Sequence, residues 1–135
     1  MRDVANDEGL RLTAYKCPSG VWTIGYGHTA GVREGMTITH RQALRLLAAD
    51  MSQAHAAVER HVKVPLRPKQ KDALASFTFN VGEGAFAQSS VVRHVNNGDM
   101  VAAAKALLLY VHDANGRKLA GLEKRRIREV MALGG

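Results

Sequence analysis

The sequence predicts an α+β domain with a small β-sheet near the N-terminus and helices over the rest of the chain. Two short segments of strand composition flank a turn in the N-terminal part, and helical spacing of apolar residues begins at Thr39. With 135 residues, 46% of them apolar, the chain can bury one core but not two. Since no repeat, linker or low-complexity tract divides it, we expect one domain over residues 1–135.

A β-hairpin is expected first. Residues 12–15 and 21–26 are rich in β-branched and aromatic side chains, and residues 18–20, Pro-Ser-Gly, have the chemistry of a tight turn. A third short strand is expected near residues 33–37. Residues 3–10 are too few for periodicity to decide, but Gly9 favours a helix end there.

A long helix is expected from Thr39, because Thr39 and Gln42 have the spacing of a capping box. Apolar residues then recur at steps of three and four: Leu44, Leu47, Ala48, Met51, Ala54 and Val58. Pro65 and Pro68 end this pattern.

Further helices are expected after the prolines. Gln70, Leu74, Phe77 and Val81 share one helix face, and Gly82 supplies a C-cap. A short helix is expected from Ser89 or Ser90 to about residue 96, followed by a turn at residues 97–99. Two last apolar stripes contain Met100, Ala103, Ala104, Leu107, Tyr110 and Val111, and then Leu122, Ile127, Val130 and Met131.

The composition limits the classes of partner. No apolar run approaches the roughly 20 residues of a membrane span, and the polar N-terminus lacks the features of a secretory signal. Cys17 is the only cysteine, so an intramolecular disulfide is excluded. The formal net charge of +7, concentrated late in the chain, favours an anionic partner such as nucleic acid, cell-wall or outer-membrane phosphates, or peptide carboxylates.

An acid, a thiol and a hydroxyl are the main candidates for chemistry. Glu8 precedes the hairpin, Cys17 begins its turn and Thr23 lies in its second strand, so the chain folds the thiol and the hydroxyl back towards the acid. Each residue alone is more often a solvated charge, a small core residue or a routine strand hydroxyl. Their spacing is compatible with a composite active site.

Three dispersed blocks of the sequence resemble the phage-type lysozymes of glycoside hydrolase family 24. They are Glu8-Gly9-Leu10-Arg11-Leu12-Thr13-Ala14-Tyr15 with Cys17-Pro18 and Gly20-Val21-Trp22-Thr23-Ile24-Gly25-Tyr26-Gly27-His28-Thr29, then Val64-Pro65-Leu66 with Gln70 to Gly82, and finally Gly121-Leu122 with Arg125-Arg126. The resemblance covers nearly the whole chain in order and in register. It implies a lysozyme-like fold: a β-hairpin lobe, a long helix from Thr39, a mostly helical C-terminal lobe and a cleft between the lobes.

The resemblance implies a muramidase that cleaves the β-1,4 bond between N-acetylmuramic acid and N-acetylglucosamine in peptidoglycan and so lyses bacterial cells. The family's catalytic positions fall on Glu8 as general acid and on Cys17 and Thr23, where the thiol replaces the Asp of many relatives. A carboxyl group can hold the leaving-group proton near neutral pH if a partly apolar setting raises its pKa. Cys17 and Thr23 would position the attacking water, and we favour this role over a covalent one for the thiol.

The resemblance extends to substrate and setting. Substrate contacts are expected from Thr29, Phe79, Asn80 and Ser89, and Phe79 is expected in the core or the cleft wall rather than in a stacking platform for bases. We expect no cofactor, no metal, no nucleic-acid partner and a monomer. The implied role is that of a phage endolysin, made in the host cytoplasm and released to the periplasmic wall at lysis. The chain is also compatible with a catalytic module taken from a longer endolysin.

Two alternatives remain open from the residues alone. A thiol peptidase built on Cys17 and His28 would act on peptide cross-links, but His28 at a strand end more often makes a structural hydrogen bond or ion pair. A basic polyanion-binding module would explain only the charge. In the last helix, Arg125 or Arg126 is expected to pair with Glu8, with the remaining cations on a solvated face that could bind an anionic surface.

Overall fold

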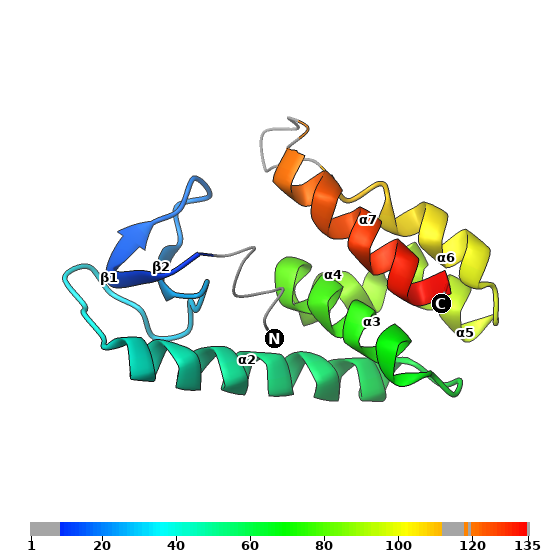
Figure 1. Ribbon diagram of the computed structural model, residues 1–135, viewed down its shortest axis with the longest axis horizontal. Coiled ribbons are helices and arrows are strands. Elements are labelled where there is room, and N and C mark those ends of the chain that lie inside the picture. Colours follow the sequence, from blue (N-terminus) through cyan, green and yellow to red (C-terminus); the bar gives the residue numbers. More distant parts are fainter. Residues whose placement is uncertain (1–8, 112–117, 119, 135) are drawn as a thin grey trace. The chain divides into compact units, whose positions relative to one another are not determined.

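The protein is described here by a computed structural model that covers residues 9–111, 118 and 120–134. Within these residues there are two strands and six helices, ordered β1, β2 and α2 to α7 (Figure 1). The chain divides into two compact units, residues 1–52 and 53–135. The α+β class is therefore confirmed, while the short helix expected before Gly9 falls outside the described residues.

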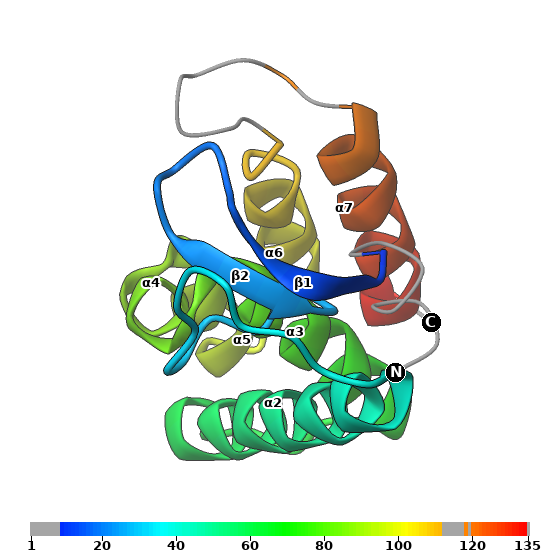
Figure 2. The ribbon, with the colours of Figure 1, turned by 90° about the vertical axis from the view of Figure 1, so that its left-hand side faces the viewer.

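The predicted hairpin is confirmed. Strands β1, Arg11–Lys16, and β2, Trp22–Gly25, pair in antiparallel fashion (Figure 2). Tyr15 stands opposite Thr23 and Lys16 opposite Trp22, and the register is irregular between Arg11 and Tyr15.

The predicted third strand is wrong. Only an isolated bridge joins Thr13 to Thr37, where the Met36 carbonyl accepts a hydrogen bond from the first strand at 2.8 Å. Before it, the Met36 N–H donates to the Arg33 carbonyl at 3.2 Å, and Gly35 has a φ of +83°. Because residues 33–36 form this turn, their backbone is not extended and cannot make a continuous ladder.

The long helix α2, His40–His61, begins at the predicted capping box. The Thr39 N–H donates to Gln42 Oε1 at 2.8 Å, and the Gln42 N–H donates to Thr39 Oγ1 at 3.1 Å. The buried apolar residues of the helix are Ala43, Leu47, Met51, Ala54, Ala57 and Val58. Leu44 was expected on this face, but 41% of it remains exposed.

Helix α3, Pro68–Val81, also follows the prediction. Gln70, Leu74 and Phe77 are buried on one face. Gly82 ends the helix with a φ of +93°, and its N–H donates to the Thr78 carbonyl at 2.7 Å. Only glycine adopts this backbone conformation at little steric cost.

Helix α4, Glu83–Gln88, has no counterpart in the prediction, because its six residues are too few to show helical periodicity. Its Phe86 is fully buried and makes edge-to-face contacts with the rings of Phe77 and His61. Glu83 accepts hydrogen bonds from Arg60 at 2.7 and 3.0 Å and ion-pairs with His61 at 2.9 Å. The buried Phe86 ring and the Glu83 carboxylate therefore anchor α4 to neighbouring residues of the second unit.

The remaining helices are α5, Ser90–Asn96, α6, Met100–Leu107, and α7, Ala120–Gly134. Ser89 and Asp99 cap α5 and α6, since their side chains accept backbone N–H groups at 3.2 and 3.0 Å. Helix α7 runs alongside α3 and α6 (Figure 1). Among the helices described, none combines the length and the apolar character that crossing a bilayer requires.

The face that α7 buries differs from the prediction. Its buried residues are Arg125, Arg126, Glu129 and Leu133. Ile127 and Met131 were expected in the core but are 47% and 73% exposed. Arg125 and Arg126 therefore do not belong to a solvated basic face, and the helix presents fewer cations to solvent than its sequence suggests.

Candidate active site

The hairpin turn positions the predicted thiol. The Gly20 N–H donates to the Cys17 carbonyl at 2.8 Å, and the Cys17 N–H donates to the Val21 carbonyl at 3.0 Å. Pro18 fixes its own φ at the second position of the turn, and Gly20 has a φ of +87°. These bonds close the turn tightly and hold Cys17 at its first corner.

The Cys17 thiol has a lowered pKa. Its Sγ lies 2.8 Å from the Ser19 hydroxyl, which can donate to the sulfur when the thiol is ionised. This hydrogen bond is the largest influence and lowers the pKa to about 7, with smaller contributions from the backbone at Val21 and Ser19 and from the Thr23 hydroxyl. Desolvation opposes the shift. Near neutral pH the group is thus an accessible thiol with substantial thiolate character.

Thr23 follows Val21, the backbone partner of Cys17, by two residues in the facing strand, and its hydroxyl contributes to the lowered pKa of the thiol. The residue is only 5% exposed, and its hydroxyl donates to the Val21 carbonyl at 3.1 Å. The hydroxyl oxygen keeps lone pairs that can accept a further hydrogen bond. The structure therefore brings together two of the three predicted catalytic side chains, while Glu8 lies outside the described residues.

His28 has a structural arrangement. Gly25 and Gly27 take positive φ values and form a tight turn, in which Ile24 and His28 exchange backbone hydrogen bonds at 2.9 Å. The ring Nδ1 lies 2.9 Å from an Asp50 carboxylate oxygen, and Nε2 lies 2.9 Å from a backbone carbonyl.

Both ring nitrogens of His28 are thereby engaged, and no hydrogen bond joins the ring to Cys17 in the part of the chain that the structure describes. This confirms the predicted structural role of His28 and disfavours the thiol peptidase alternative.

The predicted substrate-binding residues differ in their availability. Thr29 is exposed just after the hairpin. Phe79 and Asn80 are half-buried near the end of α3, and the Asn80 amide makes no hydrogen bond to another described residue. Ser89 is only 4% exposed, and its hydroxyl donates to the Phe86 carbonyl at 2.7 Å while capping α5. Thr29, Phe79 and Asn80 stay candidates for substrate contact, whereas the geometry of Ser89 fits a helix cap.

A buried charge cluster lies in the second unit. Arg126 Nε is 2.7 Å from one Glu129 oxygen, and the Ser76 hydroxyl donates to the other at 2.8 Å. The Arg126 guanidinium also lies over the Phe77 ring, 4.9 Å from its centroid. Burial raises the pKa of Glu129 to about 7, although Arg126 and Ser76 favour its ionised form. Glu8 lies outside the described residues, so its expected pairing with Arg125 or Arg126 stays a prediction. Arg126 itself forms an ion pair with Glu129.

Sequence reasoning overlooked Ser19 as the main partner of the thiol. The only local sign was a hydroxyl residue two positions after Cys17 within a turn, which brings side chains of that spacing together.

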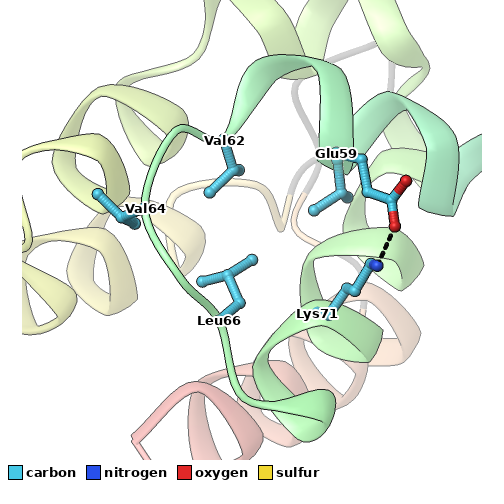
Figure 3. Close-up of a pocket in the computed structure, with 6 residues that line it drawn as sticks. Glu59, Val62, Val64, Leu66 and Lys71 are labelled. Carbon is cyan, nitrogen blue, oxygen red and sulfur yellow. Dashed lines mark hydrogen bonds and ion pairs between the residues drawn. The ribbon is translucent and has the colours of Figure 1, made fainter.

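A separate pocket of about 200 Å³ lies in the second unit (Figure 3). It is lined by Val58, Glu59, Val62, Val64, Leu66 and Lys71. Glu59 and Lys71 form an ion pair at its side, and the rest of the lining is aliphatic. None of the predicted site residues lines it. Among the described residues, no group of three or more His, Cys, Asp or Glu side chains could hold a metal ion.

The fold and the hairpin site define a lysozyme-like protein, and comparisons with known proteins identify its family. The muramidase domain of SpmX from Asticaccaulis excentricus has a similar structure, with a TM-score of 0.86 at 42% identity over 96% of this chain and 90% of that one. The P22 lysozyme structure gives a TM-score of 0.79 at 37% identity, over 99% and 94% of the two chains. The endolysin of Acyrthosiphon pisum secondary endosymbiont phage 1 is 42% identical over 90% of this chain and 86% of that protein.

The family model described as phage lysozyme matches residues 5–129. The chain belongs to the phage lysozyme family.

Proposed function

We propose that this protein is a muramidase that hydrolyses the β-1,4 bond between N-acetylmuramic acid and N-acetylglucosamine in peptidoglycan. The phage lysozyme family and its endolysins support a peptidoglycan-lysing enzyme in general. The observation that carries the finer proposal is the hairpin turn, where a thiol with a pKa of about 7 adjoins the buried Thr23 hydroxyl. Such a pair can orient a water molecule for attack on a sugar carbon.

Each group has a separate role in the proposed reaction. Glu8 protonates the leaving glycosidic oxygen as general acid. The Cys17 sulfur and the Thr23 oxygen accept hydrogen bonds from the attacking water and so fix its direction. As thiolate, Cys17 is the stronger acceptor of the two, which compensates for the missing second carboxylate. Thr29, Phe79 and Asn80 contact the glycan strand in this proposal.

The general acid is tested with Glu8→Gln, which keeps the size of the side chain but removes its acidic proton. The rate should fall by about 10²- to 10⁴-fold, while binding to purified peptidoglycan persists. Reducing ends and product masses are measured together, since hydrolysis adds one water to each cleaved strand whereas an internal transglycosylation does not. A folded Glu8→Gln protein that clears cell walls at the wild-type rate would remove Glu8 from the mechanism.

The thiol is tested with two substitutions. If Cys17 positions water, Cys17→Asp should remain active and Cys17→Ser should be impaired without being inactive. A covalent nucleophile would make Cys17→Ser inactive and leave a glycosyl adduct on the wild-type protein. Mass spectrometry after rapid quenching detects that adduct, and its presence would refute water positioning.

The proposed setting is a phage-infected bacterium, in which the protein accumulates in the cytoplasm, acts as a monomer and reaches the wall at lysis. The net charge of +7 favours approach to an anionic wall or outer-membrane surface. On α7 this attraction would depend on Lys124, which is exposed, and on Arg128, which is half-buried, because Arg125 and Arg126 are buried.

A further inference from the structure

Arg11 and Tyr15 form a stacked pair on β1. The Arg11 guanidinium carbon lies 5.1 Å from the centroid of the Tyr15 ring, which is the geometry of a cation–π contact. The contact places both side chains on the same side of the strand, despite the irregular register between them.

This side of the hairpin is also the side of Thr23. Tyr15 and Thr23 are direct partners in the antiparallel register, and side chains of directly opposed residues lie on the same face of a sheet. Lys16 pairs with Trp22 instead. Since neighbouring residues in a strand alternate between faces, Lys16 belongs to the opposite face.

The charge of Arg11 is not neutralised within the described part of the protein, where no carboxylate forms an ion pair with it. Its side chain is exposed. The contact with Tyr15 holds the guanidinium group over the ring. Its N–H groups can bind a carboxylate with two parallel hydrogen bonds. Within the described residues, an Arg held over the Tyr15 ring and without a carboxylate partner is therefore available on the same face of the hairpin as Thr23.

We propose that Arg11, oriented by Tyr15, binds a carboxylate of the peptidoglycan strand and makes the enzyme prefer acidic substrate over uncharged glycan. This inference rests on the proposed muramidase function. Peptidoglycan offers such groups on its stem peptides and, where a stem has been removed, on the lactyl group of the muramic acid. Arg11 is thus a specificity residue, whereas the chemical step belongs to Glu8, Cys17 and Thr23.

The test compares Arg11→Gln with Lys16→Gln, which removes the same charge from the other face of the same strand. Three substrates are used: peptidoglycan with intact stems, glycan strands stripped of stems by an amidase, and stripped strands whose lactyl carboxylates have been converted to amides. New reducing ends give KM and kcat for each protein and each substrate. Melting temperatures confirm that all variants are folded.

Arg11→Gln should raise KM on the acidic substrate about two- to fivefold, the effect of one exposed ion pair, and leave KM on the uncharged strand unchanged. The kcat values should not change, and Lys16→Gln should behave as wild type. A loss confined to intact stems assigns the carboxylate to the peptide, and a loss on stripped strands also assigns it to the lactyl group. Tyr15→Leu should reproduce part of the effect, since it removes the surface on which Arg11 is oriented.

An equal rise in KM on all three substrates, or no rise on any of them, would overturn the inference. If the proposed muramidase function itself is wrong, the result is distinguishable, because the wild-type protein would then release no new reducing ends from any substrate.

Discussion

Replacing Ser19 with Ala should raise the pKa of the Cys17 thiol. The Ser19 hydroxyl, 2.8 Å from the sulfur, is the largest of the influences that lower this pKa from 9.0 to about 7. Ala fits the backbone conformation of the turn but has no hydroxyl group to donate a hydrogen bond to the sulfur. Desolvation, which raises the pKa, would remain, so the pKa should return most of the way to its ordinary value.

The size of the effect follows from the two limiting pKa values. At pH 7 about half of the wild-type thiol is ionised, and a pKa near 9 would leave about 1% ionised, a fall of about 50-fold. Thiolates become better nucleophiles as the pKa of the thiol rises, by about eightfold for a rise of about two in that pKa. The alkylation rate at pH 7 should therefore fall by at most about sixfold in Ser19→Ala.

The assay benefits from the single cysteine of the chain, because every thiolate signal comes from Cys17. Thiolate absorbance and the rate of iodoacetamide alkylation are followed from acidic to alkaline pH. Thr23→Val serves as the matched control, since the Thr23 hydroxyl is the smallest contributor to the shift. The pKa of Cys17 should be lowest in wild type, slightly higher in Thr23→Val and highest in Ser19→Ala.

An apparent pKa near 9 in the wild-type protein would refute this reasoning, and so would an unchanged pKa in Ser19→Ala. If the shift occurs and Cys17 positions water as thiolate, the acid limb of the activity profile should move to higher pH in the same variant. A shifted thiol pKa with an unshifted activity profile would show that catalysis does not depend on ionisation of Cys17.

Two further outcomes are expected in the second unit. The folded-state pKa of Glu129 is raised from 4.5 to about 7, so the folded protein binds this proton more tightly, and stability should decrease as pH rises through that window. Between these two pH values, the free energy of unfolding in urea should fall by up to about 3 kcal/mol more for wild type than for Glu129→Gln. Parallel pH dependences of the two proteins would contradict the argument that the carboxyl group is buried. Replacing Lys124 and Arg128 by Gln should slow lysis of whole cells at low salt and have little effect at high salt, because a Debye length of about 8 Å at physiological ionic strength limits steering by surface charge. Cleavage of short uncharged chito-oligosaccharides by this double variant should match wild type, and wild-type lysis rates across a salt titration would leave these cations without a targeting role.

Local rules predicted much of the fold. The capping box of Thr39 and Gln42, the C-cap at Gly82 and the turn at residues 18–20 each depend on residues close in sequence, and all three are confirmed. The expected structural role of His28 follows equally from its place at a strand end, although its partner Asp50 is 22 positions away.

The misses arise from contacts that sequence spacing does not encode. Helical periodicity placed Ile127 and Met131 in the core, but the buried side of α7 is occupied by Arg126 and its ion pair with Glu129. Such a pair is stable in the interior only when both partners are present and hydrogen-bonded, and Ser76 of another helix supplies one of these hydrogen bonds. No rule based on apolar spacing can predict that face.

The candidate site was predicted in part. The resemblance placed Cys17 and Thr23 in one site, and the hairpin register explains their proximity. The influence of Ser19 on the thiol required the geometry of the turn, because a hydroxyl two residues away has many other orientations open to it. The involvement of Glu8 stays a prediction.

The way α4 is held has a consequence for the behaviour of the protein in acid. A helix of six residues is too short to be stable alone, so α4 depends on the buried Phe86 ring and on the ion pairs of Glu83 with Arg60 and His61. The hydrogen bonds and ion pairs of Glu83 with Arg60 and His61 lower the pKa of Glu83, and their stabilising effect is lost as the pH falls through that lowered value. Backbone amides of α4 should then exchange with solvent by local opening while the long helices stay closed, which makes this short segment the first part of the second unit to loosen.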